Sequence, residues 1–240
     1  MTREEAAARS AVDTDQSVAL ARLLSERFSC RAFRPDPVPR PVIERILGIA
    51  QLTASWCNSQ AWQLIVTEGA GTEKFREALF AHASSQPPGS AAQFDFPGPQ
   101  YSGIYLERRR EVGWQLYDSV GVAKGDRGGA ARQALENFRL FGAPHVAIIS
   151  ADRDLGVYGA IDCGAYVTSF VLAAQSLGVA SIAQAAIAHH SPFVRRHFNL
   201  PEQRRVVCGI SFGYQEETHA ANRFRTRRAE IAQAVDWMSA

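Results

Sequence analysis

The stretch Ser-Trp-Cys-Asn-Ser-Gln-Ala-Trp occupies residues 55–62 and runs directly into a strand-like segment, residues 63–67. It places two indoles and two amides within eight residues. Amides both donate and accept hydrogen bonds, and aromatic rings pack against flat partners. Asn58 and Gln60 can therefore read the edge of a planar heterocycle. The alternative is a capped turn that carries two core tryptophans, and this stretch alone does not separate the two.

Composition and charge exclude some classes of protein. Of the 240 residues, 46% are hydrophobic and 21% are charged, as in ordinary globular proteins. The formal net charge of +2 argues against nucleic-acid binding driven by phosphate contacts. The only lysines are Lys74 and Lys124. An anion site is therefore expected to use the planar, forked guanidinium groups of arginine.

Cysteine and histidine placement predicts neither disulfides nor a metal site. The four cysteines are far apart and form no C-x-x-C pair, which favours free thiols in the cytoplasm. The adjacent His189 and His190 have no third metal ligand nearby in the sequence. The N-terminus has no apolar signal segment. The apolar run 165–188 is interrupted by polar residues, which predicts a buried helix followed by a strand rather than a membrane span.

Hydrophobic periodicity predicts mixed helices and strands in one domain, residues 17–240, after a flexible N-terminus at residues 1–16. Helices are expected from residue 17 and over 41–52, 72–83, 104–120, 130–141, 157–177 and 191–198, with a closing helix that reaches residue 237. Strands are expected over 63–68, 144–149, 180–187 and 205–212. The helix 157–177 is apolar almost all round, which predicts that it is central and packed on every side.

Two arginines and a serine alternate at the end of the first predicted helix. Arg27, Ser29 and Arg31 can converge on one phosphate if the backbone there is helical or tightly turned. Arginine makes bidentate, charge-assisted bonds with phosphate oxygens. The alternative is a solvated basic helix end, where arginine is favourable against the helix dipole. Taken alone, the triplet favours that alternative.

An irregular excursion spans residues 84–129 and begins with a long segment rich in Ser, Pro, Gly and Gln. Segments of this length are usually functional or disordered. Phe94, Phe96 and Tyr101 lie within it, and Trp114 and Tyr117 follow on a predicted helix. These aromatic residues favour a mobile flap over a pocket. The alternative is that the rings pack into the core.

Four segments together resemble the FMN-dependent nitroreductase family, over about residues 17–238. Residues 27–33, RFSCRAF, are similar to the R-x-S-x-R-x-F signature that grips the FMN phosphate and ribityl chain. Residues 54–62 are similar to the P-S-x-x-N-x-Q-P-W segment that lines the flavin ring, although alanines replace two frequent prolines. Residues 183–186, AQAA, are similar to the segment against the isoalloxazine N5 edge. Residues 225–228, RTRR, are similar to the C-terminal part of the phosphate site.

The resemblance implies an α+β fold, a three-layer α/β/α sandwich around a mostly antiparallel sheet, in an intertwined homodimer with FMN at the interface. It also implies an oxidoreductase in which FMN takes hydride from NADH or NADPH and passes it to a nitroaromatic or similar electron-poor acceptor, with ping-pong kinetics. FMN carries the chemistry. No protein acid or base is then obligatory, and no metal, nucleic acid or membrane partner is expected.

The same resemblance assigns the site residues. Those expected to bind FMN are Arg27, Phe28, Ser29, Arg31, Ser55, Trp56, Asn58, Gln60, Gln184, Ala185, Arg225 and Arg228. Those expected to contact the acceptor, on the evidence of the excursion, are Phe94, Trp114 and Tyr117. Spacing does not decide which of Arg225, Arg227 and Arg228 reaches the phosphate.

Two further functions stay open at this point. The same fold can serve reductive dehalogenation, enone reduction or dehydrogenation of a peptide-derived ring, with the excursion selecting the acceptor. A non-catalytic flavin-binding protein is the third interpretation. The run Glu-Arg-Arg-Arg at residues 107–110 is either a solvated helix face or an attraction for an acidic acceptor such as a nitrobenzoate.

Overall fold

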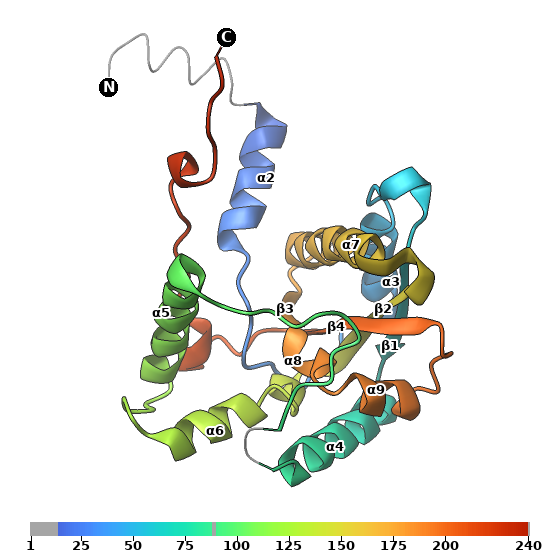
Figure 1. The fold of residues 1–240 in the computed structure, drawn as a ribbon, viewed down its shortest axis with the longest axis vertical. Helices are drawn as coiled ribbons and strands as arrows, with labels where there is room; N and C mark the ends of the chain where they lie inside the picture. The colour runs from blue at the N-terminus through green and yellow to red at the C-terminus, as the bar shows by residue number, and fades with distance from the viewer. Residues whose placement is uncertain (1–13, 88–89, 240) are drawn as a thin grey trace.

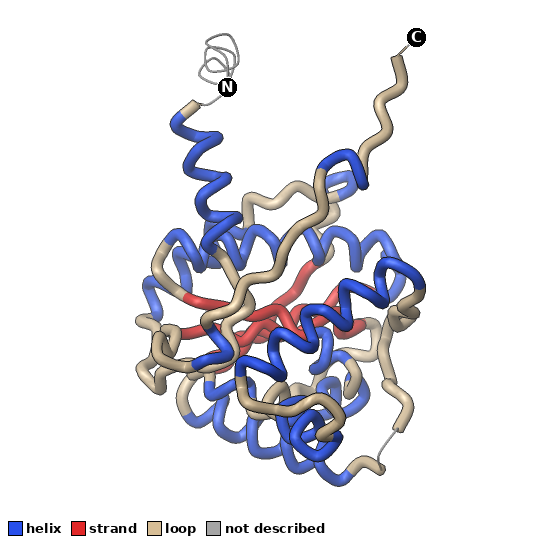
Figure 2. Tube along the Cα trace, turned by 90° about the vertical axis from the view of Figure 1, so that its left-hand side faces the viewer, coloured by secondary structure: helices blue, strands red, loops and turns tan. Residues whose placement is uncertain are grey.

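A four-stranded antiparallel sheet lies at the centre of the computed structural model, which describes residues 14–87 and 90–239. The strand order is β1-β2-β4-β3. Helices cover both faces of the sheet, as Figure 1 and the side view in Figure 2 show. The predicted α+β fold with three layers and an antiparallel sheet is therefore confirmed.

Each strand pairs antiparallel with its neighbours. The strands are β1 (Trp62–Thr67), β2 (His145–Asp152), β3 (Ala180–Gln184) and β4 (Arg204–Gly213). The two central strands, β2 and β4, are buried along nearly their whole length because helices cover both of their faces. Strand β3 ends earlier than predicted, and the chain turns directly into the short helix α8 (Ala185–Ala188).

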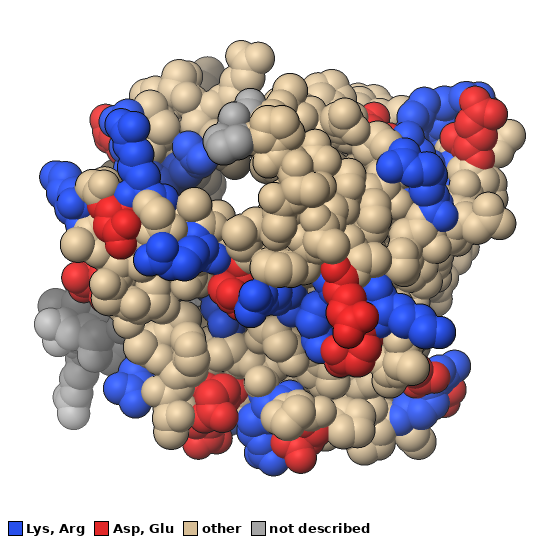
Figure 3. All heavy atoms as spheres, turned by 90° about the horizontal axis from the view of Figure 1, so that it is seen from below, with Lys and Arg blue, Asp and Glu red and all other residues tan. Residues whose placement is uncertain are grey.

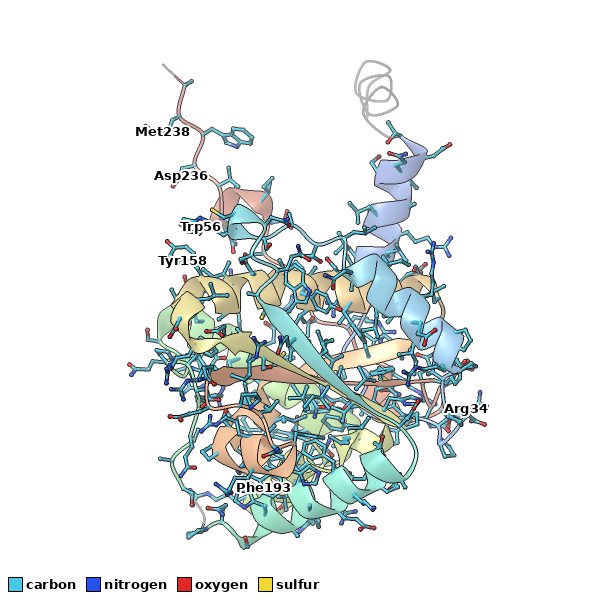
Figure 4. All side chains as sticks on the ribbon, turned by 90° about the vertical axis from the view of Figure 1, so that its right-hand side faces the viewer. Arg34, Trp56, Tyr158, Phe193, Asp236 and Met238 are labelled. Carbon is cyan, nitrogen blue, oxygen red and sulfur yellow. The ribbon has the colours of Figure 1, made fainter. Side chains whose placement is uncertain are left out.

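Two helix layers enclose the sheet and fill two core clusters. Helices α7 (Gly156–Ser176) and α3 (Arg40–Ala50) cover one face, where Tyr166 and Phe170 are buried. Helices α4 (Ala70–Ser85) and α9 (Ser191–His197) cover the other, with Phe75 buried at the centre of that cluster. In Figure 4, Tyr158 and Phe193 mark these two opposite sides.

Helix α7 is long and apolar enough to cross a membrane by length and composition alone. It nevertheless packs against α3 and the sheet, and a turn and strand β3 follow it, as predicted. The prediction that it is packed on every side is wrong for the single chain. Val157, Tyr158 and Ile161 are exposed because this part of the helix faces away from both α3 and the sheet.

The two ends of the described chain project from the body (Figures 1 and 2). Helix α2 (Asp15–Glu26) buries no residue, and a capping box between Thr14 and Ser17 starts it. The last residues of the predicted flexible N-terminus, 14–16, thus belong to the cap and first turn of α2, and residues 1–13 lie outside the described range.

The predicted closing helix is wrong. Beyond residue 228 the chain is irregular apart from a single turn, η5 (Ile231–Gln233). Short helices are marginal without a packing partner, and the apolar residues of this tail are exposed: Ile231, Val235, Trp237 and Met238.

Candidate flavin site

A pocket of about 350 Å³ lies between the segment that follows α2 and the C-terminal segment. Its lining comes from both ends of the chain and comprises Leu24, Ser25, Arg27, Phe28, Ser29, Arg31, Val112, Phe224, Arg225, Thr226 and Arg228. Six of these residues were predicted to bind FMN. The fold therefore brings both predicted phosphate-binding segments to one place.

An extended backbone, not a helix or turn, aligns Arg27, Ser29 and Arg31. Arg27 has extended dihedral angles, and Ser29 forms a parallel bridge with Ser181 at the edge of β3. Alternate side chains of an extended chain point to the same side. Cys30, between them, points the other way and is fully buried, and this burial raises the pKa of its thiol to about 11. The three residues thus line one pocket on extended backbone, without the helical or tightly turned conformation that was the stated condition for convergence.

Asn222 ties the two ends together, and nothing in the sequence pointed to it. Its buried Oδ1 accepts a hydrogen bond from the backbone N–H of Arg31 at 2.7 Å, and its Nδ2 donates to the carbonyl of Ala32 at 2.8 Å. The Asn222 carbonyl in turn accepts from Nη1 of Arg225 at 2.7 Å. The Arg225 guanidinium also lies 3.9 Å from the ring centroid of Phe28, which gives Phe28 a positioning role beside the pocket.

The pocket concentrates positive charge that the protein does not neutralise. Burial lowers the pKa of Arg27 below its ordinary value, and the neighbouring Arg228 lowers it further. Burial also lowers the pKa of Arg31. In the described part of the chain, neither these two guanidinium groups nor those of Arg225 and Arg228 form an ion pair with a carboxylate. This donor set fits the phosphate of FMN, because an anion offsets the mutual repulsion.

Arg227 faces away from this pocket. Its Nη2 lies 2.7 Å from Oε1 of Glu111 on helix α5 (Gly103–Ser119). Arg225 and Arg228 line the pocket instead. The structure therefore favours these two over Arg227 as phosphate ligands, a choice that spacing left open.

The predicted ring-reading loop, residues 55–60, has an unusual backbone. Cys57, Asn58 and Gln60 have φ values of 49°, 56° and 48°, a region that residues other than glycine occupy only when their surroundings hold them there. Ser55 supplies part of that restraint, because its Oγ accepts from the backbone N–H of Gln60 at 2.9 Å.

Helix α7 supplies the rest of the restraint through Asp162. Its carboxylate accepts from the backbone N–H of Trp56 at 3.2 Å and from Oγ of Ser59 at 3.1 Å. One turn earlier, Tyr158 packs edge-on against the Trp56 ring at 4.2 Å, as Figure 4 shows. Asp162 was not predicted, although it is the only charged residue of α7. A lone acid in an apolar helix was the available signal.

A single chain does not bring this loop to the arginine pocket. In Figure 1 the loop lies beside α3 and α7 at one side of the molecule, whereas α2 and α5, which contribute residues to the pocket lining, lie at the other side. Ser55, Trp56, Asn58 and Gln60 are therefore together, but apart from Arg27 and Arg31. Within one chain, these four residues and the arginines therefore form two separate groups.

Gln184 and Ala185 differ in what they can offer a ligand. The Gln184 side chain is buried. Its Oε1 accepts from Oγ of Ser211 at 2.5 Å, and its Nε2 donates to the carbonyl of Asn137 at 2.9 Å. The Gln184 amide is thus hydrogen-bonded within the protein. This residue can help to position the neighbouring backbone, but its side chain offers no free group to a ligand. Ala185 is exposed at the start of α8, as a contact with a flat ring requires.

Comparison with known proteins identifies the family. The nitroreductase family model matches residues 24–214. The chain belongs to the nitroreductase family. It is 34% identical to the nitroreductase NfnB of Mycolicibacterium smegmatis, with 92% of this chain and 93% of that protein covered. It is 31% identical to a 4-nitrobenzoate reductase of Pseudomonas putida, with 88% and 91% covered.

A solved structure agrees with this assignment. The crystal structure of the FMN-dependent nitroreductase NfnB from Mycobacterium smegmatis in complex with NADPH superposes with a TM-score of 0.86, at 33% identity, covering 94% of this chain and 100% of that one. The family predicted from the sequence is therefore confirmed.

The excursion of this nitroreductase is more firmly anchored than a mobile flap. The backbone N–H of Gln93 donates to the carbonyl of His189 at 2.9 Å. Asp95 pairs with Arg195 and accepts from the backbone N–H of Val206 at 2.7 Å. Between them Phe94 packs against His189 and the core cluster below the sheet. For Phe94 the structure thus shows the core-packing alternative.

Trp114 and Tyr117 remain candidates for contact with an acceptor. Both lie on α5, with their ring centroids 6.3 Å apart, and Trp114 is exposed. The arginines that precede them are solvent-exposed on the same helix. Arg108 donates to Gln233 at 3.3 Å and Arg109 lies over the Tyr101 ring. The run 107–110 is therefore a solvated helix face in this chain.

Proposed function

We propose that this protein is a homodimeric flavoenzyme that binds FMN, takes hydride from NADPH or NADH and reduces nitroaromatic compounds. The enzyme class, the cofactor and the electron donor agree with those named for relatives of about the same length. The predicted nitroreductase-type oxidoreductase is thus confirmed at the level of those relatives. The choice between NADH and NADPH and the natural acceptor of this chain are proposals.

The observation that carries the proposal is the unneutralised arginine pocket. Arg27, Ser29 and Arg31 from one end of the chain and Arg225 and Arg228 from the other would hold the phosphate. Each charge-assisted bond of this kind contributes roughly 1.5–3 kcal/mol. When bound, FMN supplies the hydride chemistry. The protein residues bind it, orient it and exclude water.

A second copy of the chain is proposed to complete the site. Helix α2 and the C-terminal tail leave the body with their apolar side chains uncovered, among them Leu24 and, at 83% and 96% exposure, Trp237 and Met238. Tyr158 and Ile161 of α7 are exposed on the same end of the molecule as the ring loop. Exposure on this scale is typical of a large apolar interface. The partner's ring loop would then meet this chain's arginine pocket.

The compartment proposed is the cytoplasm. All four cysteines are free thiols, and three of them are buried. Free thiols persist in a reducing compartment.

The test is to purify the protein, titrate the apoprotein with FMN and follow NADPH and NADH oxidation with 4-nitrobenzoate and nitrobenzene. We expect stoichiometric FMN binding, turnover with at least one acceptor, and a sedimenting mass of twice 26.3 kDa. A protein that takes up no FMN overturns the proposed function. A monomer that is fully loaded with FMN overturns the two-chain site alone.

A further inference from the structure

A chain of three side-chain hydrogen bonds runs from the core to the ring loop. The indole Nε1 of Trp62 donates to Oε1 of Gln51 at 3.0 Å. Nε2 of Gln51 donates to Oε1 of Gln60 at 3.0 Å. Nε2 of Gln60 then donates to Oδ1 of Asn58 at 3.3 Å. Gln51 lies just after the last residue of α3, outside every segment that carried the family resemblance.

The direction of this relay is set at its buried end. An indole N–H can only donate a hydrogen bond, and the Trp62 ring is buried against Tyr166. Gln51 must therefore turn its oxygen toward Trp62 and its NH₂ toward the loop. Gln60 must then present its oxygen to Gln51, and Asn58 must present its oxygen to Gln60. Each amide orientation follows from the one before it.

The exposed end of the relay is consequently a hydrogen-bond donor. The oxygens of Gln60 and Asn58 each accept one hydrogen bond within the relay. Within the described residues, Nε2 of Gln60 donates only to Asn58, and Nδ2 of Asn58 donates to no protein group. The loop thus has amide N–H groups to offer a ligand, and these suit carbonyl oxygens and unprotonated ring nitrogens.

We propose that Gln51 is a positioning residue that makes the ring loop present amide N–H groups to the acceptor atoms on the flavin ring. This inference rests on the proposed function, because it takes FMN as the ligand of the loop. Within the loop, the Gln51 side chain hydrogen-bonds to Gln60 and not to Asn58. It acts indirectly: the Trp62 indole fixes the orientation of the Gln51 amide, and Gln51 in turn fixes those of Gln60 and Asn58.

The substitution Gln51→Glu tests the relay. It should reverse the amide orientations of Gln60 and Asn58, while the side chain at position 51 keeps nearly the same shape. A carboxylate still accepts from Trp62, but it cannot donate to Gln60. Gln60 must then turn its NH₂ toward residue 51, and Asn58 must turn its NH₂ toward Gln60. The Asn58 oxygen now faces the ligand, where a donor is required.

We expect apoprotein with Gln51→Glu to bind FMN and riboflavin about ten-fold to hundred-fold more weakly, the consequence of a mismatched polar contact. Asn58→Asp, which also presents only acceptors, should lose a similar factor, and the double variant should lose little more because both changes remove one contact. Trp62→Phe removes the indole that sets the direction. Both orientations of the relay amides then become accessible, and the affinity for FMN should fall only about two-fold.

A control variant with the same added charge and a second measurement distinguish reversed amide orientation from a general effect of the substitution on the protein. Gln203→Glu adds the same charge at an exposed position whose side chain is not in the relay, and it should leave flavin affinity unchanged. A donor next to the ring stabilises the electron-rich reduced flavin. The midpoint potential of bound FMN should therefore become more negative in Gln51→Glu and stay unchanged in Gln203→Glu.

The outcomes are distinguishable. If wild-type apoprotein binds no FMN, the proposed function fails. If wild type binds FMN and Gln51→Glu matches Gln203→Glu in both affinity and potential, the relay is overturned while the function stands. An unchanged melting temperature in Gln51→Glu, expected for an exposed residue, keeps the comparison valid.

Discussion

In the proposed function, the arginine pocket and the ring loop bind two parts of one cofactor in opposite ways. The pocket is made of charged groups from both ends of the chain, on extended backbone, and it is complete within one chain. The loop is six consecutive residues with a strained backbone, neutral amides and an exposed edge. Charge tolerates loose geometry because it acts over distance, whereas amide recognition requires fixed orientation. The supporting residues differ accordingly: Asp162 and Gln51 fix the orientation of groups in the loop, whereas Asn222 joins the two chain segments of the pocket.

The largest expected effect comes from breaking the pocket. Arg31→Ala should weaken FMN binding about ten-fold to hundred-fold, because it removes charge-assisted bonds to the phosphate. Riboflavin, which has no phosphate, should bind the variant as it binds wild type. Fluorescence-quench titrations with the two flavins measure this. Arg227→Ala is the matched control, since Arg227 pairs with Glu111. Equal losses for both flavins would remove Arg31 from the phosphate site.

Lowering the pH should affect protein stability without acting directly on either flavin-binding segment. Neither segment contains a histidine, whereas four histidines cluster below the sheet. Burial, followed by the neighbouring His82 and His189, lowers the pKa of His190 to about 4. Burial also lowers the pKa of His82, with Arg196 adding to it, and that of His189. A lowered pKa means that the unfolded chain takes up protons first. The stabilising effect is complete above about pH 6.5 and is lost as the pH falls toward 4.

We expect this loss to cost roughly 1–3 kcal/mol of stability between pH 6.5 and 4.5. The melting temperature of the apoprotein should fall over that range, and FMN affinity should fall only as the protein unfolds. His190→Phe, which keeps an aromatic ring beside Phe138, should flatten the pH dependence of the melting temperature. A variant with the full wild-type slope would exclude His190 as its source.

Loosening the ring loop should have a smaller effect than breaking the pocket. Asp162→Ala removes the carboxylate that holds Trp56 and Ser59. FMN and riboflavin should both bind about ten-fold more weakly, because the loop loses its strained conformation before it meets the ring. Asp162→Asn retains one acceptor and should recover part of the affinity. A loss confined to FMN would place Asp162 in the phosphate site instead.

The smallest expected effect separates two aromatic residues of the excursion. Trp114→Ala should change kcat/KM for a nitroaromatic acceptor several-fold, since one stacked ring pair contributes about 0.5–1.5 kcal/mol beyond burial, and should leave FMN affinity intact. Phe94→Ala should instead lower stability by about 1–3 kcal/mol, because its partly buried ring packs against the core cluster. The melting temperature and the ranking of acceptors, measured on both variants, distinguish a role in acceptor contact from a role in packing. An unchanged ranking for Trp114→Ala would assign it a packing role.

The family, the sheet and most helices were predictable from the sequence because they depend on short-range patterns. Periodicity located α3, α4, α7 and all four strands, since each buries a face that its own residues define. The four arginine-bearing or amide-bearing segments were likewise visible as local groups of suitable chemistry. The closing helix failed because its apolar residues have nothing in one chain to pack against.

What only the tertiary structure decided is which of these groups meet and which way they point. Extended backbone beside β3, not a helix, aligns Arg27 and Arg31, and the pairing of Arg227 with Glu111 leaves Arg228 for the pocket. The orientation of Asn58 depends on Gln51 and on the buried indole of Trp62. A sequence specifies which hydrogen-bonding groups each residue carries. The direction of an amide depends on its partner's donors and acceptors, and only the folded chain selects that partner.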